Sequence, residues 1–373
     1  MMNSIKKYKM PADFKKKTIQ EYQNLNEQYQ GRACVSEVYG QMTDYAPGLG
    51  GRDYQDLPQV SKSELEKYVK YCNAHGIEFN YVLNGSCMGN QEFDADFHPK
   101  FSAFLSELYE MGIRTLTIAL TSLLEIIKHH PYPFHVKISV INNITTVNEA
   151  KSFFDLGADR VVLSESLNRS VYQLQKIASV CGDQTEIIVN SMCKKNCVYR
   201  MAHYNQTTHD SMAGDSKKIR TYYKHRCLMD RAKELGNLAK LCWIRPEDIP
   251  KYHALGISNF KIQGRQHAYR GDPVRTAEIY MKENYDGDLL QLLELFFPLH
   301  SFHFPLNNKQ MDGFIDPFFI YPDWCKDDCE SCHYCRDAVA KAVDLNKARH
   351  VNDNLKIFFN EYDEFMNCLR QNQ

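Results

Sequence analysis

Four cysteines near the carboxyl end of the chain have the spacing of a metal site. Cys325, Cys329, Cys332 and Cys335 follow the pattern C-x3-C-x2-C-x2-C, so four thiols fall within eleven residues. Soft thiolate ligands select iron–sulfur clusters or tetrahedral zinc, and packing of a core does not require such a density of cysteine. The spacing therefore predicts a bound metal centre, and it leaves a 4Fe–4S cluster and zinc as alternatives.

The first three of these cysteines also match C-x3-C-x2-C, the spacing that binds the cluster of radical S-adenosylmethionine enzymes. Two features argue against radical chemistry. The motif follows the main repeating region of the chain instead of opening it. In addition, the thiolate of Cys335 would fill the iron site that the cofactor needs.

A second group of cysteines lies in the middle of the chain. Cys193 and Cys197 follow a predicted strand, and a helical segment there would present both sulfurs from one face. Cys227 is a candidate third ligand. Cys242 is preferred as the fourth, with Cys87 as the alternative, because neighbouring strands lie closer than opposite ones. Buried free cysteine is also a common small hydrophobic residue, and this structural interpretation stays open.

The elements that must position these groups alternate between short β-branched segments and helical stretches. Glycine often marks the end of a helix before the next strand, and eight such units over roughly 250 residues are typical of a (β/α)8 TIM-like barrel. A doubly wound sheet would alternate similarly, but no Gly-x-Gly-x-x-Gly follows the first strand. The predicted strands are 34–41, 77–84, 114–120, 135–141, 158–165, 185–191, 239–245 and 257–263.

The extent of this alternation of strands and helices divides the chain into three parts. Residues 1–32 are predicted as a polar lead-in helix, 33–285 as the barrel, and 286–373 as a cysteine-rich carboxyl-terminal module. The fold class is therefore α/β, a barrel with a cysteine-rich extension.

Several predicted strands end in polar residues where apolar ones are expected. Such groups are costly to bury unpaired, so they should pair with one another in an internal salt-bridge layer or meet a ligand. Arginine and lysine there would suit a small molecule bearing a carboxylate or phosphate. The candidate catalytic residues are Glu37, Glu165, Arg200, His203, Lys261 and Arg265, and the candidate cofactor-binding residues are Asn84, Asn190 and Arg245.

Composition limits the class of protein. The net charge is −1, which gives no general attraction to nucleic acid, and no apolar run approaches the length of a membrane span. The basic start of the chain lacks the apolar core of a secretory signal, so a cytoplasmic location with reduced cysteines is expected. Contact with RNA stays open through the early lysines, which are Lys6, Lys7, Lys9, Lys15, Lys16 and Lys17.

The chain resembles the collagenase-like peptidase family U32 over roughly residues 33–285. The resemblance is carried by Glu37-Val38-Tyr39-Gly40, Gly51-Arg52, Phe79-Asn80-Tyr81 with Asn84, Val189-Asn190 leading into Cys193 and Cys197 with Arg200 and His203-Tyr204, Ile244-Arg245-Pro246-Glu247-Asp248, and Phe260-Lys261-Ile262 with Gly264-Arg265.

This resemblance implies a barrel with a cysteine-bound 4Fe–4S cluster at its mouth. It also implies oxygen-independent hydroxylation, since members of the family hydroxylate ubiquinone precursors or RNA bases, some with prephenate as the oxygen source. The barrel cysteines are spaced differently here, and the terminal four-cysteine motif is not general in the family. The substrate therefore does not carry over.

Three functions follow as hypotheses. The first is an iron–sulfur oxidoreductase with one or two clusters, modifying a small-molecule, peptide or RNA substrate and using an electron donor. The second is a peptidase, which the family name suggests. The third is a non-catalytic partner subunit held together by metal.

Overall fold

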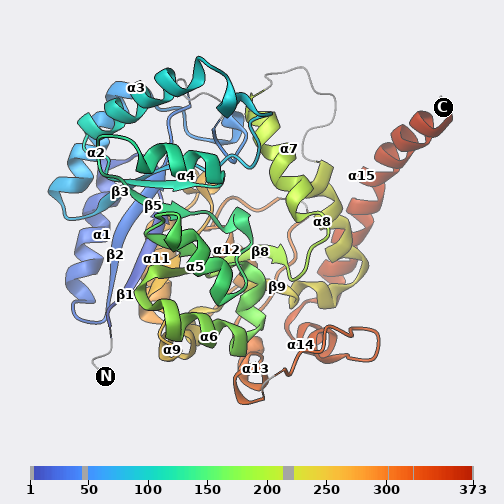
Figure 1. Cartoon of the computed structure of the whole chain (residues 1–373). Coiled ribbons are helices and arrows are strands. Elements are labelled where there is room, and N and C mark those ends of the chain that lie inside the picture. Colours follow the sequence, from blue (N-terminus) through green and yellow to red (C-terminus); the bar gives the residue numbers. More distant parts are fainter. Residues whose placement is uncertain (1–3, 44–48, 213–221, 301, 322, 372–373) are drawn as a thin grey trace.

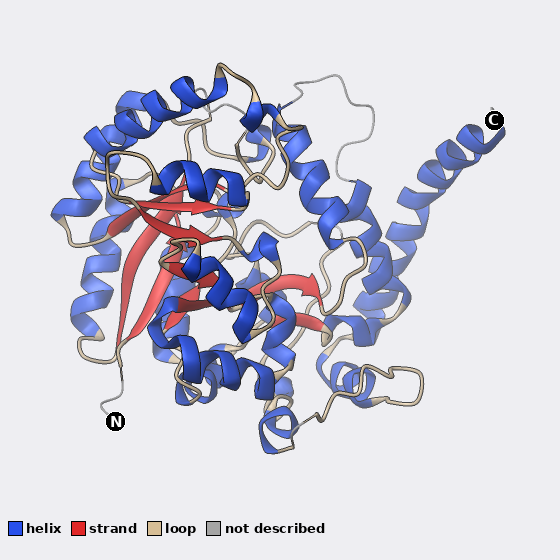
Figure 2. Cartoon of the chain, in the orientation of Figure 1, coloured by secondary structure: helices blue, strands red, loops and turns tan. Residues whose placement is uncertain are grey.

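The chain folds around a closed barrel of parallel strands, seen in the computed structural model of Figures 1 and 2. The structure describes residues 4–43, 49–212, 222–300, 302–321 and 323–371. The strand order around the barrel is β1-β10-β7-β6-β5-β4-β3-β2, which confirms the predicted (β/α)8 fold. The barrel strands are β1 (Lys6–Pro11), β2 (Ala33–Gly40), β3 (Glu78–Leu83), β4 (Thr115–Ile118), β5 (His135–Ile138), β6 (Arg160–Val162), β7 (Thr185–Ile188) and β10 (Asn259–Lys261).

Helices cover the outside of the barrel and extend beyond it (Figure 2). None of the described helices combines the length and the apolar character that a membrane crossing requires. The helices are α1 (Lys16–Gln28), α2 (Lys62–Ala74), α3 (Phe97–Glu110), α4 (Thr121–Lys128), α5 (Val147–Asp155), α6 (Val171–Cys181), α7 (Arg200–Met212), α8 (Tyr222–Lys233), α9 (Ile249–Ala254), α10 (Arg265–Ala268), α11 (Pro273–Lys282), α12 (Leu289–Leu293), α13 (Asp316–Ile320), α14 (Tyr334–Ala342) and α15 (Leu345–Gln371).

The first barrel strand differs from the prediction. Within residues 1–32 the expected lead-in helix is present as α1, but β1 precedes it and belongs to the barrel, so the predicted domain boundary at residue 33 falls inside the barrel. The period of two explains why a lysine-rich segment forms a strand. Tyr8 and Met10 are fully buried in the hydrophobic core, while Lys9 is buried among the charged groups of the interior.

One predicted barrel strand lies outside the barrel. The segment predicted at 239–245 contains β9 (Leu241–Trp243), which pairs antiparallel with β8 (Asn190–Lys194) in a separate two-stranded ribbon. An apolar, β-branched pattern is the same for either partner, because it reports burial of a strand and not which strand it pairs with.

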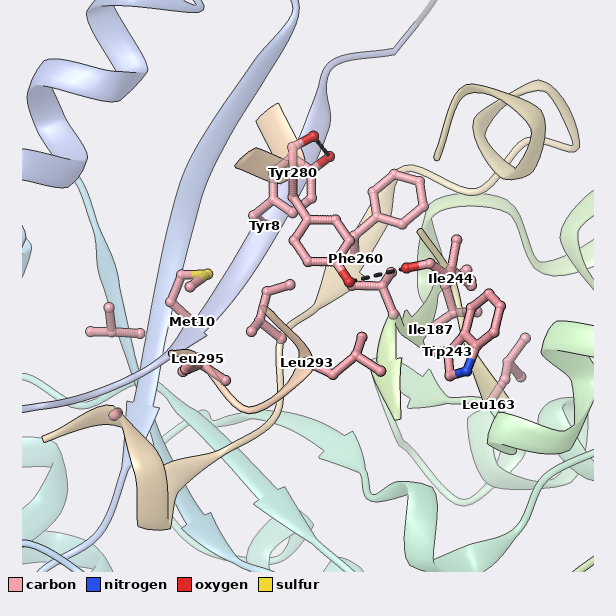
Figure 3. Close-up of a cluster of buried hydrophobic side chains, with 14 of the residues drawn as sticks. Tyr8, Met10, Leu163, Ile187, Trp243, Ile244, Phe260, Tyr280, Leu293 and Leu295 are labelled. Atoms are coloured by element: carbon pink, nitrogen blue, oxygen red, sulfur yellow. Dashed lines mark hydrogen bonds between the residues drawn. The ribbon is translucent and has the colours of Figure 1, made fainter. Parts of the chain in front are cut away.

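A cluster of buried side chains fixes this ribbon to the barrel wall (Figure 3). The Tyr8 hydroxyl donates to the carbonyl of Tyr280 at 2.9 Å, and the Tyr280 hydroxyl donates to the carbonyl of Ile244 at 3.0 Å. The indole N–H of Trp243 donates to the carbonyl of Leu238 at 2.8 Å. Each buried polar tip in this cluster has a partner, so the aromatic rings contribute their apolar area without an unsatisfied donor.

Charged side chains fill part of the barrel interior. Lys137 pairs with Glu37 and lies 3.2 Å from Glu186, while Lys261 lies 3.8 Å from the same Glu186. Lys9 donates to the Ser36 hydroxyl at 2.7 Å. Because Lys137, Glu37 and Glu186 are fully buried, their charges depend on one another instead of on water.

The charged interior predicts a loss of stability in acid. Burial by itself raises the pKa of Glu186, but the ammonium groups of Lys137, Lys261 and Lys9 lower it to about 2. A lowered carboxyl pKa stabilises the fold above the ordinary value of 4.5, and this contribution, about 3 kcal/mol, disappears as the pH falls from 4.5 towards 2. Urea midpoints measured across this range should fall steeply for the natural chain. The slope should be shallower for Glu186→Gln, and an equal slope in both proteins would contradict the assignment.

Candidate active site at the barrel mouth

Elements that follow the carboxyl ends of the strands build one site at the mouth of the barrel. Loop residues 49–52 lie over the mouth, since the Gly85 N–H donates to the Leu49 carbonyl at 2.7 Å. Helix α7 packs against the same loops, because the Ser211 hydroxyl donates to the Gly50 carbonyl at 3.1 Å. This is the end of a (β/α)8 barrel where active sites form.

The barrel cysteines come from four places. Cys193 lies on β8, Cys197 in the turn before α7, Cys227 on α8 and Cys242 on β9. The helical pairing expected for Cys193 and Cys197 is therefore replaced by a strand and a turn, in which Asn196 has a φ of 53°. Asparagine tolerates this left-handed conformation better than most residues, so the turn can present Cys197 next to α8.

The thiols of Cys197 and Cys227 interact directly. The Cys227 thiol donates a hydrogen bond to Cys197, and this bond lowers the pKa of Cys197 to about 6 despite partial burial. The same bond, with burial, raises the pKa of Cys227. Near neutral pH the pair therefore holds one thiolate and one thiol, and thiolate is the form that binds metal.

Cys193 is an electrostatic neighbour of this pair, and Cys242 is in turn a neighbour of Cys193. Burial, with a contribution from the charge of Glu165, raises the pKa of Cys193 to about 11 and that of Cys242 to about 12. The negative charge of a Cys193 thiolate in turn acts on Cys227 and Cys242. A set made of thiols alone suits a soft metal centre such as an iron–sulfur cluster.

The cysteine side chains are not yet arranged around a centre. Across residues 4–43, 49–212, 222–300, 302–321 and 323–371, no three His, Cys, Asp or Glu side chains form a group that could already hold a metal ion. These cysteines therefore suit a cluster by their ligand type and by their proximity to one another. Binding would require the side chains to turn towards a common point.

Arg200 and Glu165 form the polar wall next to Cys193. The Arg200 guanidinium lies 3.5 Å from Glu165 and donates to the hydroxyls of Ser164 and Ser166 at 3.2 and 3.3 Å. The Tyr204 hydroxyl donates to Glu165 at 3.5 Å. Burial opposes the charge of Arg200, but Glu165 and then Cys193 raise its pKa, so the guanidinium stays protonated.

His203 stands at the outer part of this wall. Burial, followed by the charges of Arg52 and Lys224, lowers the pKa of His203 to about 4. Its ring therefore stays neutral at physiological pH and can accept a proton. Tyr204 and Tyr223 are its aromatic neighbours, with ring centroids 6.4 and 6.2 Å away.

Two neighbouring arginines, Arg52 and Arg265, lie at the mouth. Arg265 is buried, donates to the amide oxygen of Gln41, and donates to that of Asn84 at 3.2 Å. Burial, followed by repulsion from Arg52, lowers the pKa of Arg265 to about 9. Within the described part of the chain, neither Arg52 nor Arg265 forms an ion pair, and the buried amide nitrogen of Gln41 lacks an acceptor.

Glycine allows the loop that carries Arg52 to approach this closely. A Cβ atom on Gly51 would lie 2.8 Å from both the backbone and the side-chain oxygens of Asn84. The Gly51 N–H donates to the same side-chain oxygen at 3.2 Å. Asn84 therefore holds both the loop and Arg265, which places the predicted Asn84 at the mouth as a positioning residue.

Several other predicted site residues lie in structural networks. Glu37 and Lys261 belong to the charged interior beneath the mouth, where burial lowers the pKa of Lys261 and its ammonium lies 4.2 Å from the Tyr39 ring centroid. The Asn190 amide donates to the carbonyls of Gln263 and Leu293 at 2.8 and 2.9 Å, which ties the ribbon to the chain after β10.

Arg245 is likewise paired within the structure. It donates to Asp248 at 3.0 Å, to Asp312 at 2.6 Å and to the carbonyl of Asn308 at 2.9 Å. Its guanidinium therefore anchors the carboxyl-terminal segment, and the mouth residues are not among these partners.

The sequence prediction did not select Arg52, Gln41, Lys137 or Glu186 as site or interior residues. The tight Gly50-Gly51 pair before Arg52 was the available signal, because adjacent glycines permit close backbone approach. Lys137 and Glu186 carried no such signal, since each stands alone in an ordinary strand.

The tail cysteines lie against the same ribbon as the barrel cysteines. Cys325 and Cys335 are half-buried, whereas Cys329 and Cys332 are exposed. The ammonium of Lys195, in the turn after β8, lies 3.7 Å from the Cys325 sulfur.

Comparisons with known proteins place this chain in a family. The family model described as Peptidase family U32 matches residues 50–283. An uncharacterized protease of Methanocaldococcus jannaschii is 28% identical over 297 residues, which are 80% of this chain and 86% of that protein. Among solved structures, a U32 peptidase aligns with a TM-score of 0.49 and 14% identity over 70% of this chain and 94% of its own, and a D-psicose 3-epimerase with 0.35 and 14% over 57% and 82%. Since the family model matches more than half of the residues, the chain belongs to peptidase family U32.

Proposed function

We propose that this protein is an iron–sulfur enzyme that carries out oxygen-independent hydroxylation, or a related redox modification, of an anionic substrate. The observation that carries the proposal is the neighbourhood of the Cys193, Cys197 and Cys227 thiols and of Arg52 and Arg265, which form no ion pair among the described residues.

The thiols would hold the cluster. Cys193, Cys197 and Cys227 are three ligands from three segments, and Cys242 is the nearest candidate for the fourth. When bound, a 4Fe–4S cluster supplies one-electron chemistry. The positive charges of Arg200 and Arg52, which act on Cys193, favour its thiolate form and so favour ligation.

The arginines would bind the substrate. A buried guanidinium with a lowered pKa is destabilised by its surroundings until an anion arrives. A carboxylate or phosphate between Arg52 and Arg265 would relieve their repulsion and accept charge-assisted hydrogen bonds. The free amide nitrogen of Gln41 adds one more donor for the same anion.

Proton transfer beside the bound substrate would involve Glu165, Tyr204 and His203. The Tyr204 hydroxyl already donates to Glu165, so a proton has a path between them. The neutral ring of His203 can accept a proton at the outer side of the wall. Small molecules, peptides and RNA can each carry the negative charge that this site requires. An electron donor is the expected partner.

Iron content tests the proposal. Protein purified without oxygen should lose about four irons and four sulfides per chain on Cys193→Ser/Cys197→Ser. Cys34→Ser is the matched control, because Cys34 lies at the amino end of β2, opposite the mouth, and its substitution should leave the iron unchanged. Equal iron in the natural chain and the double variant would overturn the proposal.

The second candidate is a peptidase, which the family name and the name of the archaeal relative favour. Iron-free protein that cleaves a peptide as fast as the iron-loaded form would support this candidate. It would at the same time contradict the iron–sulfur proposal.

A further inference from the structure

We propose that Cys325, Cys329, Cys332 and Cys335 hold a second 4Fe–4S cluster, docked against the ribbon that carries Cys193 and Cys242. This site is separate from the barrel mouth, and its occupancy does not depend on the function proposed above.

The tail cysteines form one loop whose two ends face the body of the protein. Cys335, near the start of α14, is an electrostatic neighbour of both Cys325 and Cys329. The half-buried ends of the loop are Cys325 and Cys335, and the exposed Cys329 and Cys332 lie between them in sequence. A loop of this kind can close around a metal centre without rearranging the core.

Positive groups from the body face this loop. Lys195 lies 3.7 Å from the Cys325 sulfur and 2.9 Å from Asp327. Arg169 and Lys240 act on Cys335. Four thiolates around a 4Fe–4S core carry a net negative charge, and cations placed on one side compensate it.

A series of aromatic ring contacts docks the loop onto the ribbon. The ring centroids of Trp324 and Tyr334 are 5.6 Å apart, and those of Tyr334 and Phe314 are 5.5 Å apart. The Phe314 centroid in turn lies 5.6 Å from that of Trp243 on β9. The Tyr334 hydroxyl donates to the Phe314 carbonyl at 2.8 Å. Trp324 directly precedes Cys325, and Tyr334 directly precedes Cys335. These ring contacts therefore fix the two ends of the loop.

The absence of a side chain at Gly236 allows the tail to pack closely at this point. A Cβ atom there would lie 3.0 Å from the Cα of Arg336, the residue after Cys335. The backbone of α14 therefore rests directly on the turn that precedes β9.

The ribbon brings the two cysteine groups near each other. Cys193 and Cys242 lie on its two strands. Lys195 and Lys240 are each two residues from these cysteines, at the same end of the ribbon. The Lys195 N–H donates a hydrogen bond of 3.0 Å to the Lys240 carbonyl. Two residues of strand span about 7 Å. Arg169 acts on both Cys242 and Cys335, so one guanidinium lies near a member of each group.

The spacing favours iron over zinc. Structural zinc sites join two separated ligand pairs, whereas the C-x2-C-x2-C core of the tail has the close succession of cubane ferredoxin ligands. A cubane also spreads its ligands over a larger surface than a single zinc ion, which suits a loop with two exposed cysteines.

Metal analysis of the natural chain and three variants tests this site separately from the barrel site. Protein purified without oxygen should lose the tail cluster, about four irons, on Cys329→Ser/Cys332→Ser. The Cys193→Ser/Cys197→Ser variant should keep these tail irons and lose only those of the barrel site. Both tail cysteines are exposed, so the fold should tolerate the change, and Ser331→Ala in the same loop is the matched control with unchanged iron. Unchanged iron in the tail variant, or about one zinc per chain that the tail variant loses, would overturn the proposal.

The docking is tested by electron paramagnetic resonance of the dithionite-reduced protein. Two adjacent reduced clusters should interact, which broadens the spectrum, and each double variant should show a narrow spectrum of one cluster. A spectrum of the natural chain that equals the sum of the two variant spectra would overturn the docking.

Discussion

Lys137→Met is expected to destabilise the barrel by about 3–5 kcal/mol, a large share of the stability of an ordinary domain. Lys137 is the one described cation paired with both Glu37 and Glu186, and all three are fully buried. Methionine fills a similar volume but leaves two buried carboxylates whose remaining positive neighbours are Lys9, Lys261 and Arg160. Urea unfolding followed by far-UV circular dichroism measures the change.

Two comparisons make this result specific. Lys151→Met, at an exposed position of α5, should change the stability by less than about 0.5 kcal/mol. Lys137→Met combined with Glu37→Gln and Glu186→Gln should recover part of the loss, because the uncompensated charges are removed. A triple variant less stable than Lys137→Met alone would show that the loss comes from packing instead of charge.

Arg265→Gln is expected to weaken the binding of small anions about 10- to 100-fold, because hydrogen bonds to a charged group each contribute about 1.5–3 kcal/mol. Succinate and phosphate, at constant ionic strength, are suitable probes, and the shift of the unfolding temperature with their concentration gives the affinity. Arg32→Gln, at an exposed position before β2, is the matched control and should bind as the natural chain does.

The same variant should not be less stable without an anion. Because burial and Arg52 lower the pKa of Arg265 to about 9, its charge opposes folding at neutral pH. Removing that charge should therefore leave the unfolding temperature equal or higher. A destabilised variant whose anion affinity is unchanged would contradict the assignment of Arg265 to ligand binding.

The barrel could be predicted because eight strands alternate with helices regardless of which strands pair. The identity of two strands could not, since β1 carries three lysines and β9 has the apolar pattern of a barrel strand. Closure of a barrel is decided by hydrogen bonds between strands far apart in the chain, such as β1 with β10. Local periodicity contains no information about these partners.

By itself the sequence determined which thiols are candidate metal ligands, because cysteines are recognisable by type and spacing, and it determined the fold class through its alternation. The tertiary structure decided which charges meet. It buried Glu37 and Lys261 in the interior with Lys137 and paired Arg245 within the structure, and among the described residues it gave Arg52 and Arg265 no carboxylate partner. The physical reason is that pairing of charges depends on distance in space, which neighbouring residues in the chain do not set.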